Sequence, residues 1–583
     1  MTSTASIVDA HLVERARHWL AADPDPDTRA TMNELLTAYS NGDVAAAHEL
    51  ADAFAGQLEF GTAGLRAAMG PGPNRMNRVT VSRAAAGLAG YLAARQSGSV
   101  VIGYDARHKS DLFARDTAEI LEGAGFRALL LPRALPTPVL AYAIRALGCI
   151  AGVMVTASHN PAGDNGYKVY LGDGAQIAPP IDTAISAAIN AVGAHAEICR
   201  ALAAHVVSED VIDSYVRDVV ALIPDSAPRE ISVVYTAMHG VGGSIFQRLL
   251  ADSGFAPAHP VAAQFAPNPD FPTVAFPNPE EPGAMDLAIA EAIARDADLV
   301  IANDPDADRC AAGVPIRSDG SDGQTAFRML RGDEVGWLLA WWMYETGTRG
   351  VFANSIVSSS LLGKMAAAYG LEHRETLTGF KYLGHLPGLA YGYEEALGYC
   401  VDPGHVSDKD GLSAGLRIAQ LVAALKSQGR TVHDILDELA VTFGVHATHQ
   451  LSIRVANLSL IDSIMARLRA SPPLTIAGRL VLGIDDFAVG VDGLPMSNVL
   501  RLRLIDDTRV IVRPSGTEPK LKCYLEVVVP VRAAGESGSE STSESTAENL
   551  AAARHQAAQQ LESLVASMTR ILTPDQFIDQ GTL

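Results

Sequence analysis

The stretch from Val153 to Tyr170 reads VMVTASHNPAGDNGYKVY and decides how the rest of the chain is interpreted. A short apolar run, Cys149 to Val155, precedes a cluster of Ser, His, Asn, Pro, Gly and Asp, which is typical of a buried strand that ends in a loop. Open α/β sheets bind ligands at the carboxyl ends of their strands. Ser158 lies there beside His159, and Lys168 follows, so the loop is a candidate site. Its composition alone also fits an ordinary turn.

The length and composition describe a multidomain globular protein. The chain has 583 residues, too many for one hydrophobic core, and typical domain sizes suggest about four domains. Its apolar fraction is 48% and its mean hydropathy is +0.13, yet no run of about 18 apolar residues could span a bilayer. Charged residues interrupt the apolar positions of the first 27 residues, unlike those of a secretory signal. We therefore expect a cytoplasmic protein without membrane association.

The charge and the cysteines argue against several classes of function. A formal net charge of −21 at pH 7 would repel a phosphate backbone, so we do not expect a general nucleic-acid-binding protein. A small anionic substrate would instead need local clusters of basic residues. The scattered cysteines contain no C-x-x-C pair, which argues against a disulfide framework or a zinc site. We expect buried or inert thiols at Cys149, Cys199, Cys310, Cys400 and Cys523.

Alternating strand and helix patterns predict an α/β fold. The predicted strand Val100 to Tyr104 leads Asp105 and Arg107 into a loop, and strand-like runs then alternate with helical patterns in three successive rounds. This alternation predicts βαβ units. The last region has the order strand, helix, strands, helix, which favours an α+β domain. We predict four domains with the boundaries 1–205, 206–325, 326–445 and 446–583.

Three segments interrupt these patterns. Prolines exclude regular structure from Pro267 to Pro279 and mark a long ordered connection. The glycine cluster His239 to Gly243 lacks the spacing of a dinucleotide fingerprint, because Ile245 stands where the third glycine should be. Residues 533–549 are rich in Ser and Glu, so we expect a flexible surface insertion before a helix over Leu550 to Leu572.

The segment Asn303 to Arg309, NDPDADR, is a candidate metal site that directly follows the predicted strand Leu299 to Ala302. Asp304, Asp306 and Asp308 would repel one another unless a cation shares them, and oxygen ligands suit Mg²⁺. We expect Asp306 to be exposed to a cleft. The alternative is a solvated acidic loop, whereas an EF-hand is excluded because no glutamate closes the loop.

A basic loop, Val512 to Lys520, reads VRPSGTEPK between two predicted strands. Arg513 can form a forked contact with a phosphate, while Ser515, Thr517 and the backbone amides around Gly516 supply neutral donors. These groups favour an anion-binding cradle over a plain hairpin loop, which would not need them. A serine, a divalent ion and a phosphate cradle in one chain are what reversible phosphoryl transfer requires.

Four motifs identify a resemblance to a known family. TASHNP (156–161), DPDADR (304–309), GYEEALG (392–398) and RPSGTEP (513–519) resemble, in order, the four signature loops of the α-D-phosphohexomutase superfamily. The resemblance covers nearly the whole chain. It implies a heart-shaped protein in which three mixed α/β domains and a C-terminal α+β domain surround a central cleft.

The resemblance also implies roles for individual residues. Ser158 corresponds to the phosphoserine, and a phosphoserine oxygen would complete a Mg²⁺ site with Asp304, Asp306 and Asp308. The residues implied at the reaction centre are Arg66, His159, Arg309, Lys409 and Lys168, of which Lys168 is the best candidate for the acid/base residue. Residues implied in sugar or phosphate binding are Thr378, Gly379, Glu394, Lys409, Arg513, Ser515, Gly516 and Thr517.

The implied enzyme is an isomerase, an intramolecular phosphotransferase of the phosphoglucomutase/phosphomannomutase type. Phospho-Ser158 would donate its phosphoryl group to a sugar monophosphate, the bisphosphate intermediate would turn end for end, and Ser158 would take back the other phosphate. One Mg²⁺ and the sugar bisphosphate, as activator, would be the cofactors. The protein would be a monomer or a homodimer acting on small sugar phosphates.

Two alternatives keep the fold but change the function. A sugar-bisphosphate synthase would recharge Ser158 from an outside donor, although no Walker A pattern is present. A non-catalytic sugar-phosphate-binding protein would leave Ser158 unphosphorylated.

A third alternative is a phosphopentomutase, which acts on ribose or deoxyribose phosphates. Ala396 stands where many hexomutases carry a serine whose hydroxyl helps to bind the sugar, while Glu394 is present. Tyr393 and the segment Thr378 to Lys381 would also change the outline of the cleft. We predict activity on glucose or mannose phosphates, loose specificity at C2, and measurable activity on pentose phosphates.

Overall fold

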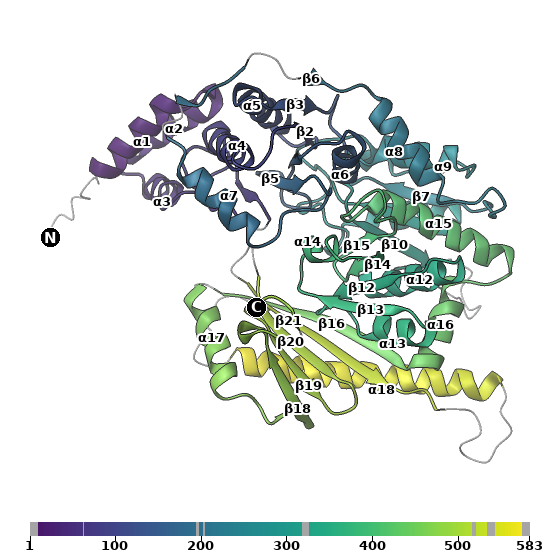
Figure 1. The fold of residues 1–583 in the computed structure, drawn as a ribbon. Helices are drawn as coiled ribbons and strands as arrows, with labels where there is room; N and C mark the ends of the chain where they lie inside the picture. Colours follow the sequence, from purple (N-terminus) through teal and green to yellow (C-terminus); the bar gives the residue numbers. More distant parts are fainter. Residues whose placement is uncertain are drawn as a thin grey trace. The chain divides into compact units, whose positions relative to one another are not determined.

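The computed structural model describes residues 10–61, 63–193, 197–201, 205–316, 326–455, 458–491, 493–515, 520–532 and 543–573. Figure 1 shows the helices and strands that these residues form. The chain divides into two compact units. Unit 1 consists of Met1–Arg331, Gly384–Leu386 and Leu397–Gln428, and unit 2 consists of Gly332–Leu383, Pro387–Ala396 and Gly429–Leu583.

A six-stranded mixed sheet lies in the amino-terminal part of unit 1, in the order β1-β5-β4-β2-β3-β6. Its strands are β1 (Leu65–Ala68), β2 (Ser99–Tyr104), β3 (Arg127–Leu130), β4 (Ala151–Val155), β5 (Asp164–Leu171) and β6 (His205–Val206). β2 pairs in parallel with β3 and β4, whereas β5 runs antiparallel to β4 and β1. Parallel pairs need crossover connections, which agrees with the alternation of strands and helices predicted from the sequence.

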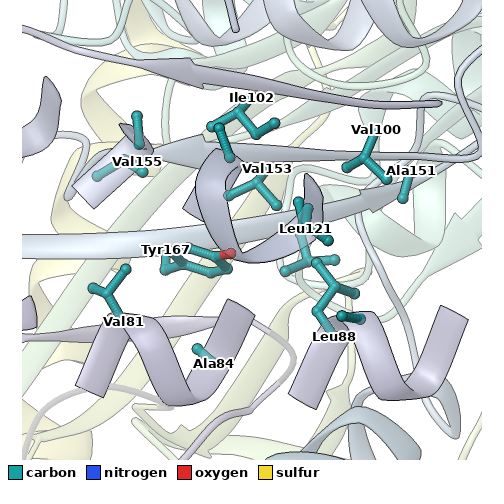
Figure 2. Close-up of a cluster of buried hydrophobic side chains, with 14 of the residues drawn as sticks. Val81, Ala84, Leu88, Val100, Ile102, Leu121, Ala151, Val153, Val155 and Tyr167 are labelled. Atoms are coloured by element: carbon teal, nitrogen blue, oxygen red, sulfur yellow. The ribbon is translucent and has the colours of Figure 1, made fainter. Parts of the chain in front are cut away.

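Helices around this sheet bury its apolar side chains. They are α4 (Arg78–Ala93), α5 (Ser110–Gly123), α6 (Thr137–Ala146) and α7 (Ile181–Asn190). Figure 2 shows the core, in which Val100 and Ile102 of β2 and Val153 of β4 lie near Leu88 of α4 and Leu121 of α5. All five are 0% exposed, and each such burial stabilises the fold by about 1.5–3 kcal/mol. This core fixes the carboxyl end of β4, from which the Ser158 loop starts.

Three amino-terminal helices form a smaller core, α1 (Ala10–Ala22), α2 (Pro26–Ser40) and α3 (Val44–Ala53). Met32 and Leu50 are fully buried in it. The Asp25 carboxylate caps α2 by accepting from the Asp27 amide and also accepts a hydrogen bond from Lys109 Nζ. This contact joins the small core to the loop that follows β2.

A second mixed sheet of unit 1 has the order β11-β10-β9-β7-β8. Its strands are β7 (Val233–Thr236), β8 (His259–Pro260), β9 (Leu299–Asn303), β10 (Cys310–Pro315) and β11 (Phe327–Met329). The helices of this part of the chain are α8 (Asp210–Val220), α9 (Gly243–Asp252), α10 (Ala262–Phe265) and α11 (Asp286–Arg295). Two later elements, β15 (Gly398–Cys400) and α15 (Gly411–Ser427), also belong to unit 1, and α15 packs against β9 and β10. Residues 267–279 contain neither helix nor strand, as their prolines predict.

Unit 2 begins with parallel strands and ends with an antiparallel sheet. The first part contains α12 (Gly332–Glu345), β12 (Val351–Ser355), α13 (Leu361–Tyr369), β13 (Glu372–Thr376), α14 (Phe380–Leu383) and β14 (Leu389–Glu394), with β12 parallel to β13 and β14. α16 (Val432–Phe443) leads to a sheet in the order β16-β21-β20-β19-β18-β17.

The carboxyl-terminal part has the predicted order of strand, helix, strands, helix. It contains β16 (Val445–Arg454), α17 (Leu458–Ala470), β17 (Thr475–Ile476), β18 (Arg479–Asp486), the 3₁₀ turn η2 (Phe487–Val489), β19 (Leu500–Leu504), β20 (Arg509–Pro514), β21 (Lys520–Val529) and α18 (Ser543–Leu572). The neighbouring strands from β21 to β17 and the pair β16 and β21 are antiparallel. The predicted α+β region is therefore confirmed.

One expectation about the fold needs correction. Residues 543–549 are part of α18 and not of a flexible insertion, because the helix that follows extends towards the amino terminus by cooperative propagation; residues 533–542 lie outside the described part. Cys199 is exposed, whereas the other four cysteines are buried as expected. Among the described helices, none is long and apolar enough to cross a membrane.

Candidate active site

Ser158 lies three residues beyond the end of β4, where the sequence predicts the ligand-binding end of the sheet. Its backbone has φ of 53°, in the left-handed region that residues with a Cβ rarely occupy. The Thr156 hydroxyl accepts a hydrogen bond from the Ser158 amide at 2.8 Å and so helps to hold this turn. Ser158 is only 2% exposed, and its hydroxyl group is held by neighbours on both sides.

The three aspartates lie in the tight connection between β9 and β10, which pair antiparallel with Asn303 opposite Cys310. This connection packs against the glycine cluster 239–243. A Cβ atom on Gly240 would lie 2.3 Å from the Cα atom of Pro305, and the Val241 amide donates to the Pro305 carbonyl at 2.9 Å. Gly240 therefore allows a close backbone approach to the aspartate loop, and this packing explains the glycine without a bound nucleotide.

The structure brings Ser158 and the aspartate loop together within unit 1. Ser158 Oγ donates to Asp304 Oδ2 at 2.8 Å, across 146 residues of sequence. Asp304 and Asp306 are 0% exposed and Asp308 is 1% exposed. The expectation that Asp306 faces an open cleft is wrong, because Thr137 Oγ1 and Lys168 Nζ both donate to its Oδ2 and enclose it.

Two lysines balance the buried carboxylates. Lys168 Nζ donates to Asp306 Oδ2 at 2.8 Å and to Asp308 Oδ2 at 2.9 Å, and Lys409 Nζ lies 3.3 Å from Asp308 Oδ2. Burial alone would lower the pKa of Lys168, but the charges of Asp306 and Asp308 outweigh burial and raise it. Burial would raise the pKa of Asp308, but Lys168, Lys409 and Arg309 lower it. Lys168 is therefore an ammonium ion and Asp308 a carboxylate at neutral pH.

The carboxylate group fits a divalent cation. One oxygen from each of Asp304, Asp306 and Asp308 lies within 4.8 Å of the others. Within the described residues, Asp306 Oδ1 and Asp308 Oδ1 are buried and have no hydrogen-bond partner. Burial and the charges of the other two aspartates raise the pKa of Asp304 well above its usual range, which is a cost that a bound cation would relieve. Oxygen donors of this kind suit a hard ion.

His159 and two arginines surround the serine. His159 Nδ1 lies 3.2 Å from Ser158 Oγ. Burial, and then the charges of Arg309 and Arg66, lower the pKa of His159 well below its usual range, so the imidazole is neutral at pH 7. Arg66 donates to the side-chain oxygen of Asn160 at 3.1 Å. A neutral imidazole and two guanidinium groups beside a hydroxyl form a polar, positively charged surrounding for an anionic group.

The predicted sugar-binding residues lie in unit 2. Glu394 ends β14 and accepts a hydrogen bond from the Gly379 amide at 2.6 Å, and Thr378 precedes that glycine. The neighbouring Glu395 accepts from the hydroxyls of Ser355 and Ser358, at 3.2 and 3.0 Å. The two adjacent carboxylates therefore have different partners. Glu394 is fixed to the segment of Thr378 and Gly379, whereas Glu395 is fixed to Ser355, the last residue of β12, and to Ser358.

The predicted phosphate-binding loop also lies in unit 2. Arg513 and Ser515 are partly buried at the end of β20, and the Ser515 amide donates to the Lys520 carbonyl at 2.8 Å. This bond joins the residue that follows β20 to the first residue of β21. Gly516 and Thr517 lie outside the described residues.

Some site residues were not identified in the sequence. Thr137 donates to Asp306 at 2.6 Å, although it lies at the start of α6 and carries no motif. Asp408 accepts from Lys409 and from the hydroxyl of Tyr170. Asp408 could have been suspected from the run Asp-Lys-Asp-Gly at 408–411, whereas Thr137 had no local signal.

Together, these features define a multidomain α/β protein in which a buried serine hydroxyl lies beside a group of carboxylates that could hold a cation. Four models of the phosphoglucomutase/phosphomannomutase family match this chain. Alpha/beta/alpha domains I, II and III match residues 57–195, 213–315 and 331–443, and the C-terminal domain matches residues 497–536. Each matched range lies within a different predicted domain.

Curated relatives match most of the chain. A "probable phosphomannomutase" of Haemophilus influenzae is 49% identical over 77% of this chain and 93% of its own. A "probable phosphoribomutase" of Schizosaccharomyces pombe is 34% identical over 89% and 94%. A phosphoglucomutase of Staphylococcus haemolyticus is 35% identical over 82% and 91%.

A solved structure shares the fold. A phosphoglucomutase/phosphomannomutase family protein of Burkholderia thailandensis superposes with a TM-score of 0.64 at 19% identity, over 87% of this chain and 98% of that one. The chain belongs to the phosphoglucomutase/phosphomannomutase family, within the α-D-phosphohexomutase superfamily. The resemblance identified from the four sequence motifs is thus confirmed.

Proposed function

We propose that this protein is a phosphohexomutase that moves a phosphate between C1 and C6 of glucose or mannose phosphates. It is an isomerase in this proposal, and Ser158 carries the phosphoryl group between the two positions. The observation that carries the proposal is the 2.8 Å hydrogen bond from Ser158 Oγ to Asp304 Oδ2, beside aspartates that Lys168 bridges. It joins a nucleophile to a cation site, as phosphoryl transfer requires.

The residues around Ser158 have separate roles in this proposal. The sugar hydroxyl loses its proton as its oxygen attacks the phosphorus of phospho-Ser158, the bond from phosphorus to Ser158 Oγ breaks, and Ser158 Oγ takes up a proton. The same steps run in reverse at the other end of the sugar. Lys168 is the acid/base residue, and its ammonium state suits it to donate a proton. His159, Arg66 and Arg309 stabilise negative charge on the transferred group.

We propose that Mg²⁺ is the cation. Asp304, Asp306 and Asp308 would hold it with an oxygen of phospho-Ser158, and it would supply charge neutralisation of the phosphoryl oxygens. Lys168 pairs with Asp306 and Asp308, and Lys409 pairs with Asp308, so both lysines offset the negative charge of these carboxylates. The sugar bisphosphate is both the intermediate and the activator that phosphorylates Ser158.

The remaining predicted residues bind substrate in this proposal. Glu394, with Thr378 and Gly379, binds sugar hydroxyls, and Lys409 binds substrate near the serine. Arg513, Ser515, Gly516 and Thr517 bind the phosphate that does not react. The boundaries 1–205, 206–325, 326–445 and 446–583, a cytoplasmic location and a monomeric or homodimeric state are further parts of the proposal.

The sugar can be decided by one comparison. The absence of a hydroxyl at Ala396 favours relaxed specificity, and the similarity to a phosphoribomutase makes a pentose phosphate the second candidate. Values of kcat/KM for glucose 1-phosphate, mannose 1-phosphate and ribose 1-phosphate should be measured on one preparation. We expect a hexose to be preferred; a pentose advantage above about a hundredfold, about 2.7 kcal/mol, would make the protein a phosphopentomutase.

The reaction type has its own test. Intact-protein mass before and after addition of glucose 1,6-bisphosphate should show one phosphoryl group on Ser158. A protein that stays unmodified would be a binding protein, and net release of bisphosphate in place of net isomerisation would identify a bisphosphate synthase.

A further inference from the structure

One buried arginine holds the loop that carries Ser158. Arg107 follows β2, is 4% exposed, and donates four hydrogen bonds to main-chain carbonyls of this loop. Its Nη2 donates to the carbonyls of Ser158 at 2.6 Å and Asn160 at 2.5 Å. Its Nη1 donates to those of Pro161 at 2.7 Å and Asp164 at 3.2 Å. These carbonyls span the connection from β4 to β5, so one guanidinium group fixes the course of the whole loop.

Two neighbours hold Arg107 in place. Asp105 Oδ2 lies 3.4 Å from Arg107 Nε, and Asp105 Oδ1 accepts from the Arg107 amide and from the hydroxyl of Ser110. The guanidinium carbon lies 4.9 Å from the ring centroid of Phe271. Phe271 belongs to the proline-rich connection 267–279, for which the sequence suggested no function. This connection thus covers the arginine.

The loop needs support from outside because its backbone is not relaxed. A residue with a Cβ in the left-handed region costs about 1–2 kcal/mol, and Ser158 has φ of 53°. Without Arg107, each of the four carbonyls would lose its hydrogen bond from the guanidinium group, although the Pro161 carbonyl also accepts from the Asp164 amide at 3.1 Å. The hydroxyl of Ser158 would then leave its position 2.8 Å from Asp304.

We infer that Arg107, supported by Phe271, is a positioning residue that holds the Ser158 hydroxyl in the orientation needed for phosphoryl transfer. Arg107 acts through the main chain and contacts no reacting atom. The inference rests on the proposed function, because it takes Ser158 as the phosphoryl carrier. A displacement of about 1 Å at a reacting group can lower a rate about 100-fold.

Arg107→Lys is the direct test, and the chain offers a matched control. Lysine keeps the charge, but its single ammonium group cannot reach carbonyls on both sides of the loop. Arg229 also donates to several main-chain carbonyls, those of Pro224, Asp225, Ala227 and Ser253. Arg229→Lys therefore removes a similar set of bonds in unit 1 without any contact with the Ser158 loop.

Three measurements separate positioning from general destabilisation. They are the rate of Ser158 phosphorylation by glucose 1,6-bisphosphate, followed by intact mass, the steady-state kcat and KM, and hydrogen exchange of the amides of residues 158–164. For Arg107→Lys we expect the phosphorylation rate and kcat to fall by about 30- to 100-fold, KM to stay within about threefold, and exchange to become at least about tenfold faster. Arg229→Lys should leave all three within about threefold of the wild type.

Phe271→Leu provides a second variant with a milder change. It removes the ring that covers Arg107 but keeps an apolar side chain, so we expect kcat to fall by about three- to tenfold. Should Arg107→Lys not fold, this variant with the same three measurements decides the question.

The inference is wrong if the wild type is phosphorylated and Arg107→Lys matches it within threefold, or if KM rises while kcat is unchanged. A wild type that takes up no phosphoryl group would instead contradict the proposed function. In that case hydrogen exchange still shows whether Arg107 holds the loop.

Discussion

The Ser158 centre of unit 1 and the two proposed recognition loops of unit 2 differ in how their side chains are held. The Ser158 centre consists of Ser158, Asp304, Asp306, Asp308, Lys168 and Lys409, and each of these residues is buried. The recognition loops carry Glu394 and Arg513, which are only partly buried. In the Ser158 centre, residues from distant strands support one another through charged hydrogen bonds.

The difference fits a division of labour between reaction and recognition. Groups that act on a phosphoryl group must be fixed before the substrate arrives, because reorganisation would raise the barrier. Groups that recognise different sugar phosphates must stay accessible to the substrate, and each of their hydrogen bonds contributes only a modest binding free energy. Four variants test this division and a fifth tests the stability of unit 2, from the largest expected effect to the smallest.

Ser158→Ala should have the largest effect. It removes the hydroxyl that carries phosphate in the proposed mechanism, so turnover should fall by at least about 10⁴-fold and no phosphoprotein should form. Ser253→Ala, which removes another buried hydroxyl of unit 1, is the control and should retain activity. Mutase activity above a few per cent of wild type in Ser158→Ala would place the reaction elsewhere.

Asp306→Asn should lower kcat by about 10³-fold, because it removes one negative charge from the cation site. Burial makes some loss of stability unavoidable, since Thr137 and Lys168 both bond to this carboxylate. Turnover should be measured across a Mg²⁺ titration together with the melting temperature. Near-normal turnover at limiting Mg²⁺ would contradict the metal assignment.

The stability test concerns the buried carboxyl group of Asp333, which we expect to lower the free energy of unfolding when it ionises. It accepts from the Tyr393 hydroxyl at 3.0 Å and the Ser359 amide at 2.8 Å, and burial, with the charges of Glu395 and Glu526, raises its pKa to about 7. The unfolded carboxyl ionises near pH 4, so stability falls as pH rises from about 4 to about 7.

Asp333→Asn should remove this cost and keep both accepted hydrogen bonds. At about 1.36 kcal/mol per unit, we expect it to stabilise the protein by about 2–4 kcal/mol at pH 8 and to be nearly neutral at pH 4. Urea unfolding at both pH values measures the difference, with Glu334→Gln as the control. Equal effects at both pH values would show that Asp333 ionises normally.

Arg513→Ala should weaken binding of the monophosphate by about 2 kcal/mol, which is the loss of one charge-assisted fork, and leave Ser158 phosphorylation by bisphosphate possible at high concentration. Direct titration of glucose 6-phosphate gives the affinity. If affinity is unchanged while turnover collapses, Arg513 belongs with the reaction and the proposed division is wrong.

Ala396→Ser should have the smallest effect. It adds a hydroxyl to the sugar loop, and one hydrogen bond is worth about 0.5–1.5 kcal/mol. We expect the preference between glucose 1-phosphate and mannose 1-phosphate to change by up to about tenfold in kcat/KM. An unchanged ratio would mean that this position does not contact the sugar.

Much of the Ser158 centre could be predicted because its chemistry is contiguous in the sequence. Ser158 and the three aspartates each occur in one loop directly behind an apolar strand, so their places at strand ends followed from the pattern. Their contacts did not, since Thr137 and Asp306 are 169 residues apart and no periodicity relates them.

Burial and helix limits were less predictable. The spacing of three carboxylates at alternating positions does not reveal that Asp306 is buried, because its burial depends on Lys168, which lies on β5. Composition also failed at residues 543–549, where Ala547 and Glu548 favour helix and a long amphipathic segment follows. In both cases a distant or adjoining element outweighed the local signal.

The return of residues 397–428 to unit 1 limits the modularity of this chain. A fragment that stops at Arg331 would lack Lys409, which balances the aspartates, and α15, which packs on β9 and β10. Such a fragment would also leave the buried hydroxyl of Tyr215 without Asp410, the carboxylate to which it donates a hydrogen bond at 2.9 Å. We therefore expect a fragment that contains only the first two family domains to be unstable without this later segment, although these domains are consecutive in the sequence.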